Sequence, residues 1–169
     1  MNQALIRFVA IIFGAAGLAC LLGVCLNVVT ANVAVEYFSV HHAQIVETKN
    51  PWILAVVWGV AASWWFGAIS GLIVASINHL RAEPLRPLRV LKWIAVACVL
   101  LWLTMIAILV AILLFTSTIA VEERTSTFEQ DRRLVAVAMA HQYEYVLGTI
   151  ALLVISAMTW RAKPASEAR

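Results

Sequence analysis

The chain has 169 residues, of which 63% are hydrophobic and 12% are charged, and its mean hydropathy is +0.92. A soluble core of this size cannot enclose so much apolar surface, so the composition predicts an integral membrane protein. The net charge is +3, but the basic residues flank apolar segments instead of forming a stripe on a soluble domain. This distribution argues against nucleic acid as a partner.

Four nearly uncharged segments predict four transmembrane helices within a single domain, residues 1–169. They cover about residues 8–35, 52–77, 93–121 and 134–160. Each is longer than the roughly 20 residues that cross a bilayer core of about 30 Å. The short polar connections leave no room for a soluble domain, so the predicted fold class is all-α, an integral membrane four-helix bundle.

The first segment has a second interpretation, a cleaved signal peptide. Arg7 precedes the apolar run, and the small residues Ala31 and Ala34 resemble a cleavage site. The run is much longer than the apolar region of a usual signal, which is about 7 to 15 residues long. A retained helix is therefore favoured, whereas cleavage would leave three spans.

The second segment carries small residues at every fourth position, which are Gly59, Ser63, Gly67 and Gly71. A stripe of this kind lets a neighbouring helix approach closely. The stripe favours packing inside the bundle. A dimer interface is the alternative. The expected partners are therefore the lipid bilayer and, if the stripe is an interface, a second copy or another membrane subunit.

The basic residues are distributed unequally between the two ends of the predicted bundle. Eight of the 12 lie near the N-terminus, between the second and third segments, or near the C-terminus: Arg7, Arg81, Arg86, Arg89, Lys92, Arg161, Lys163 and Arg169. The positive-inside rule then predicts that both termini are cytoplasmic, in a bacterial-type inner membrane. Every helix is longer than a bilayer crossing needs, so we expect the bundle to extend beyond the outer membrane face.

The fourth segment contains Glu144, the only ionisable residue well inside a predicted span. A carboxylate that faces lipid is costly, so Glu144 is expected to face the bundle interior or to take up a proton. His141 lies three residues before Glu144 and four before Tyr145. The three side chains therefore share one face of the helix.

A second polar face is expected where the first helix continues outward past residue 35. If it does so, one face of the helix carries Asn27, Thr30, Tyr37 and His41. In that arrangement His42 and Glu36 point elsewhere.

Imidazole and carboxylate groups at the outer end of the bundle fit two interpretations. One is a single transition-metal ion, either Zn, Cu or Fe, since these metals accept such ligands and bundle interiors hold such sites. The candidate ligands are His41, His42, His141 and Glu144, with Glu36, Tyr145 and Asn27 as supporting polar groups. The other is a structural or proton-responsive network in which Tyr145, His141 or Asn27 holds Glu144.

These residues favour a binding or sensing protein, or a subunit of a membrane complex, with an outward-facing metal- or proton-responsive site. A small proton-coupled transporter acting as an oligomer is one alternative, but the sequence has no second charge deeper in the bundle to continue a proton path. A metal-dependent membrane enzyme is another. No GxSxG, HExxH or phosphate-binding loop motif supports an enzyme.

Overall fold

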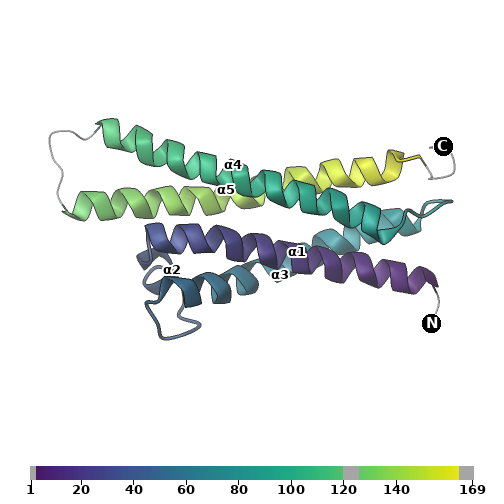
Figure 1. The fold of residues 1–169 in the computed structure, drawn as a ribbon, viewed down its shortest axis with the longest axis horizontal. Helices are drawn as coiled ribbons and strands as arrows, with labels where there is room; N and C mark the ends of the chain where they lie inside the picture. The colour runs from purple at the N-terminus through teal and green to yellow at the C-terminus, as the bar shows by residue number, and fades with distance from the viewer. Residues whose placement is uncertain (1–2, 120–125, 164–169) are drawn as a thin grey trace.

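The computed structural model describes residues 3–119 and 126–163, and every regular element within these ranges is a helix. The elements are α1 (Gln3–Val33), α2 (Glu36–Ser39), α3 (Pro51–His79), α4 (Pro87–Ile119) and α5 (Ser126–Arg161). The long helices α1, α3, α4 and α5 lie antiparallel to their neighbours along the chain (Figure 1). Contacts join α1 to α3, α4 to α5, α1 to α4 and α3 to α5, which is the arrangement of a four-helix bundle. The predicted fold class is confirmed.

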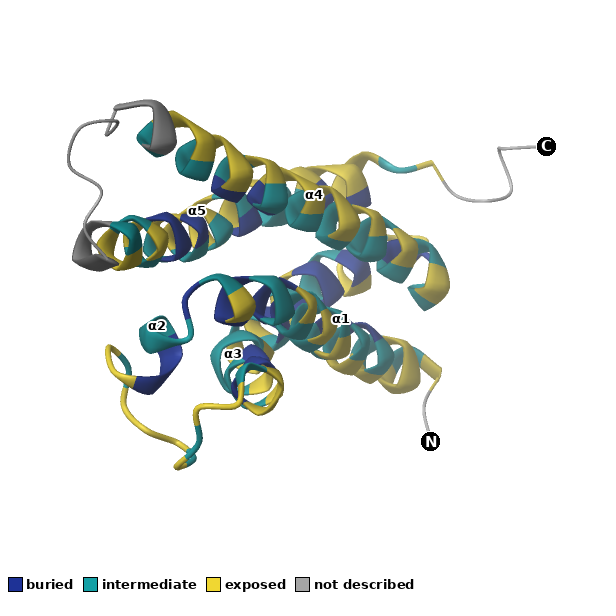
Figure 2. Ribbon diagram, turned by 60° about the vertical axis from the view of Figure 1, so that its left-hand side comes forward, coloured by how far each residue is buried: buried dark blue, intermediate teal, exposed yellow. Residues whose placement is uncertain are grey.

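All four long helices are long and apolar enough to cross a membrane, as in a multi-pass membrane protein. At about 1.5 Å per residue they measure about 44 to 54 Å, against a hydrocarbon thickness of about 30 Å. Their outward faces are exposed, and the buried residues face the bundle interior (Figure 2). Large apolar side chains such as Phe13 and Leu153 are 72% and 65% exposed, an arrangement that suits a lipid environment.

Polar sequence signals extend the helices past their apolar segments. The Asn50 side chain accepts hydrogen bonds from the backbone N–H groups of Trp52 and Ile53, at 2.9 and 3.4 Å, and Pro51 takes the first helical position of α3. This is the arrangement that an N-cap followed by proline predicts. Similarly, α5 begins at Ser126, before its apolar part. The predicted end of the third span, residue 121, lies outside the described residues.

The first helix ends earlier than its apolar segment predicts. α1 stops at Val33, and after a short break the single turn of α2 forms over Glu36–Ser39. The condition for one continuous face with Asn27, Thr30, Tyr37 and His41, a first helix that continues past residue 35, is therefore not met. Phe38 in α2 is 3% exposed and packs with Leu54 and Ala55 of α3, so tertiary packing replaces the continuation of α1.

The small-residue stripe of α3 packs against α1 of the same chain. A Cβ atom placed on Gly59 would lie 2.5 Å from the backbone nitrogen of Val24, and one on Gly67 would lie 2.5 Å from the Cβ of Ala19. A Cβ on Gly23 of α1 would in turn meet Ser63 of α3. Only residues without a larger side chain allow this approach, and packing inside the bundle is the interpretation that the structure supports.

The interior is well packed towards both ends of the bundle. Near the α3–α4 connection, Ile11, Val74, Val90 and Ile155 belong to one buried cluster. Near α2, one cluster joins α1, α4 and α5, and another joins α1, α2 and α3. The region between these ends contains the cavity described below.

Side-chain hydrogen bonds hold the α3–α4 connection in place. The Asn78 side chain donates to the Leu85 carbonyl oxygen at 3.2 Å and accepts from the Leu85 N–H at 2.8 Å. Arg81 donates to the carbonyl oxygens of Thr159 and Trp160 at 2.6 and 2.5 Å. The last carbonyls of a helix have no partners within it, so Arg81 caps the C-terminus of α5.

Candidate functional site

The His141 ring and the Glu144 carboxyl group face each other on the inner side of α5. The His141 Nδ1 atom lies 3.5 Å from the Glu144 Oε2 atom, and the two side chains are 14% and 17% exposed. Glu144 also lines a small interior hollow of about 40 Å³, together with Ser63 of α3 and Leu22 of α1. The prediction that Glu144 faces the bundle instead of lipid agrees with this geometry.

Thr30 of α1 contacts the other nitrogen of the His141 ring. Its Oγ1 atom lies 3.2 Å from the His141 Nε2 atom and 3.2 Å from the carbonyl oxygen of Leu26. Thr30 is completely buried. Both ring nitrogens of His141 therefore have a partner, one on its own helix and one on α1.

The single hydroxyl hydrogen of Thr30 can point to only one of its two neighbours at a time. If it points to His141 Nε2, the neutral ring carries its proton on Nδ1, which faces the Glu144 carboxylate. If the ring is protonated, Nε2–H donates to Thr30, and Thr30 donates to Leu26 instead. For the ring that carries its neutral proton on Nδ1, adding one proton thus reverses the hydrogen bond between α5 and α1.

Aromatic rings from the α2 region surround this pair. The Tyr37 ring is stacked on His141, with ring centroids 5.1 Å apart and an interplanar angle of 5°. Phe38 presents its edge to the same imidazole at 5.7 Å. The next layer consists of His42, whose ring lies 4.5 Å from Tyr37 and 5.0 Å from Trp58. The break after α1 is what brings these rings over α5.

The surroundings of Tyr37 keep its phenol protonated. Burial raises the pKa of the Tyr37 phenol, and the nearby Tyr145 and Glu144 raise it further. A negative charge on Glu144 opposes a second negative charge on the phenol. Tyr37 is therefore a neutral ring at ordinary pH and covers the His141 ring.

The predicted metal ligands are not brought together. Within residues 3–119 and 126–163, no group of three or more His, Cys, Asp or Glu side chains could hold a metal ion. His41 is exposed, and the Nδ1–H of His42 donates to the Tyr37 carbonyl oxygen at 2.8 Å. The described residues thus give the predicted Zn, Cu or Fe site no support.

The predicted supporting groups have other roles. The Tyr145 hydroxyl lies 3.5 Å from the carbonyl oxygen of Ala62 in α3, and its ring stacks on Trp65. Asn27 is buried at 3% exposure, and Glu36 begins α2. Among the hydrogen bonds of the described residues, none joins Asn27, Glu36 or Tyr145 to Glu144. His141 is the group that holds the carboxylate.

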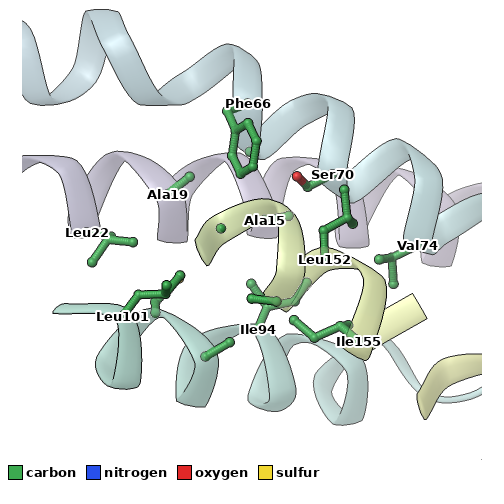
Figure 3. A pocket seen from close by; sticks show the side chains of 15 residues that line it. Ala15, Ala19, Leu22, Phe66, Ser70, Val74, Ile94, Leu101, Leu152 and Ile155 are labelled. Carbon is green, nitrogen blue, oxygen red and sulfur yellow. The ribbon is translucent and has the colours of Figure 1, made fainter. Parts of the chain in front are cut away.

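A second interior hollow lies directly next to the Glu144 hollow, deeper in the bundle. Its volume is about 70 Å³, and all four long helices line it (Figure 3). The two hollows share lining residues, including Phe66 and Gly148. Ser70 contributes a buried hydroxyl that has no hydrogen-bond partner among the described residues. Apart from this hydroxyl and the thiol of Cys98, the wall is hydrocarbon.

Sequence reasoning identified the pair on α5 but missed most of its surroundings. The helical spacing of three residues predicted the contact between His141 and Glu144. Thr30 was placed on the expected polar face of the first helix, but its bond to His141 depends on how α1 packs against α5. No sequence signal indicated that His42, and not His41, would join the rings around Tyr37.

The described residues form an all-helical bundle with four candidate membrane spans and a histidine–carboxyl pair near one end. Comparison with protein-family models, with curated proteins and with solved structures gave no match. The interpretation of the chain therefore depends on its own geometry.

Proposed function

We propose that this protein is a multi-pass membrane protein whose outward-facing His141–Glu144 pair is a proton-responsive site. It resides in a bacterial-type inner membrane. The N-terminal end of α1, the α3–α4 connection and the C-terminal end of α5 are on the cytoplasmic side. The unequal distribution of basic residues supports this orientation. The role is that of a sensor or of a subunit in a membrane complex.

The observation that carries this proposal is the bonding of the His141 ring on both nitrogens. Histidine is the side chain whose charge ordinarily changes between pH 5 and 8. Here the ring has a carboxyl group 3.5 Å from one nitrogen and a hydroxyl 3.2 Å from the other. Because the hydroxyl belongs to α1 and the imidazole to α5, a change of protonation alters a contact between two helices.

The residues that line the interior favour a proton-responsive site over a proton-conducting path. The hollow beneath Glu144 is lined by hydrocarbon, the Ser70 hydroxyl and the Cys98 thiol, and no described carboxylate or imidazole lines it. Towards the α3–α4 connection it meets the packed cluster that contains Val74 and Ile155. A transporter needs successive proton carriers through the membrane, and these described residues supply only the first.

The experiment is nuclear magnetic resonance of ¹⁵N-histidine-labelled protein in lipid nanodiscs between pH 5 and 8. The chain has only four histidines, so each signal can be assigned by substitution. We expect the His141 ring signals to change over this range, and both Glu144→Gln and Thr30→Val to alter that change. His79, at the opposite end of the bundle, supplies the control signal, which neither substitution affects.

Two results would contradict the proposal. One is a His141 ring whose signals stay constant from pH 5 to 8. The other is a titration that is the same in the wild type, in Glu144→Gln and in Thr30→Val, because the ring would then act independently of both partners.

A further inference from the structure

The outer surface of the bundle carries an apolar groove along the seam between α4 and α5. Its volume is about 380 Å³. Val96 and Leu100 on α4 and Val154 on α5 line it and are 58%, 59% and 52% exposed. The groove therefore faces outward, towards the surroundings of the bundle. It shares Leu101 with the Glu144 hollow, but neither His141 nor Glu144 lines it.

The length of the groove corresponds to one leaflet of a bilayer. On α4 it runs from Trp93 to Thr104, and on α5 from Leu147 to Met158. Each stretch covers about 16 Å at about 1.5 Å per residue. Half of a hydrocarbon core of about 30 Å is about 15 Å, so the groove has the reach of a lipid acyl chain in a single leaflet.

One end of this groove is basic. The Arg89 guanidinium lies 5.3 Å from the centre of the Trp93 ring, which lines the groove. Lys92 lies one helical turn before Val96, and Arg161 lies one turn after Met158; both are exposed. The other end, at Thr104 and Leu147, has no lysine or arginine within one turn on either helix.

We propose that the α4–α5 groove binds one anionic phospholipid, with an acyl chain along the groove and its phosphate at Arg89, Lys92 and Arg161. The apolar wall of the groove suits a lipid acyl chain. The cations lie at the end of the groove where the acyl chain would join its headgroup. Basic pockets between membrane helices recognise anionic headgroups in this way. The proposal requires membrane insertion but is independent of the His141–Glu144 pair.

The test is native mass spectrometry of the full chain in mild detergent, with added phosphatidylglycerol or phosphatidylcholine of identical acyl chains. We expect the wild type to retain one phosphatidylglycerol in preference to phosphatidylcholine. Each cation that is removed lowers the affinity for the anionic lipid about 5-fold, so Lys92→Gln with Arg161→Gln lowers it about 25-fold. Arg7→Gln removes a charge from the start of α1, away from this groove, and leaves the preference unchanged.

A second pair of variants tests the acyl-chain part of the site. Val154→Trp fills the groove and is expected to abolish retention of phosphatidylglycerol. Leu153→Trp, on an exposed part of α5 that does not line the groove, is expected to retain the lipid. Both substitutions are at exposed positions, so the fold of the bundle is preserved.

Three outcomes would overturn the proposal. The first is a wild type with no preference for phosphatidylglycerol, and the second is equal loss in Val154→Trp and Leu153→Trp. The third is displacement of the lipid by free glycerol phosphate at the same concentration, which would assign the cations to a soluble phosphate. The pH titration of His141 is read separately, so failure of either experiment leaves the other interpretable.

Discussion

Replacing Gly59 by alanine perturbs the closest approach between α1 and α3. The added Cβ would lie 2.5 Å from the backbone nitrogen of Val24 and 2.6 Å from its Cα. Both atoms belong to the backbone of α1, so no side chain can rotate to make room. The two helices must separate locally, and contacts along their interface are lost.

The expected destabilisation follows from comparison with Gly17. A Cβ on Gly17 would have no atom within 4 Å. Gly17→Ala therefore gains only the helix propensity of alanine, about 1 kcal/mol. Gly59→Ala gains the same amount but also pays for overpacking, which is typically about 1 to 3 kcal/mol. Since the propensity terms cancel, Gly59→Ala is expected to be less stable than Gly17→Ala by about 1 to 3 kcal/mol.

Unfolding of both variants in mixed micelles, by titration with a denaturing detergent, measures this difference. Size-exclusion chromatography with light scattering should show the same oligomeric state for both, because the stripe packs within one chain. Equal stability of the two variants would refute the assigned α1–α3 interface. A change of oligomeric state in Gly59→Ala alone would point instead to the dimer interpretation of the stripe.

Two further predictions concern the ends of the bundle. Arg81→Gln removes charged hydrogen bonds to the last carbonyls of α5. The Ala162 amide donates to the Met158 carbonyl oxygen in this last turn, and its hydrogen exchange should accelerate about 10-fold. Unchanged exchange would contradict the capping role of Arg81. Burial raises the pKa of Tyr37 above its usual value of about 10. The folded protein therefore keeps this proton at a pH at which the unfolded chain has lost it. The free energy of unfolding should then fall as the pH rises above about 10. Tyr37→Phe should make this decline shallower between pH 9 and 11, whereas Tyr143→Phe, at an exposed position, should not.

The number of long helices could be predicted because it depends on the number and length of the apolar runs in the sequence. Apolar runs longer than a bilayer crossing leave few alternatives to membrane helices. Their ends depend on capping, and Asn50 followed by Pro51 marked one start correctly. The apolar run predicts an end at residue 35, before the charge of Glu36, whereas α1 ends two residues earlier, at Val33. Residues 31–35 contain no glycine or proline that would mark this earlier end.

Some contacts of the candidate site also follow from local sequence spacing, whereas others depend on tertiary packing. His141 and Glu144 meet because three residues of helix place them together, and this rule needs no knowledge of the fold. Thr30, Tyr37 and His42 reach the pair from other elements. Their positions follow from the early end of α1 and from the burial of Phe38 against α3, which are properties of the packed bundle.

The proposed proton-responsive site, His141 with Glu144, lies between the packed clusters near α2 and the central hollow. The Glu144 side chain is only 17% exposed, so its carboxyl group interacts mainly with neighbouring protein groups. His141 is the only described group that forms an ion pair with it, and that same ring holds α1 through Thr30. In the proposed response, a proton added to the ring alters its contacts with the carboxylate and with Thr30 at the same time.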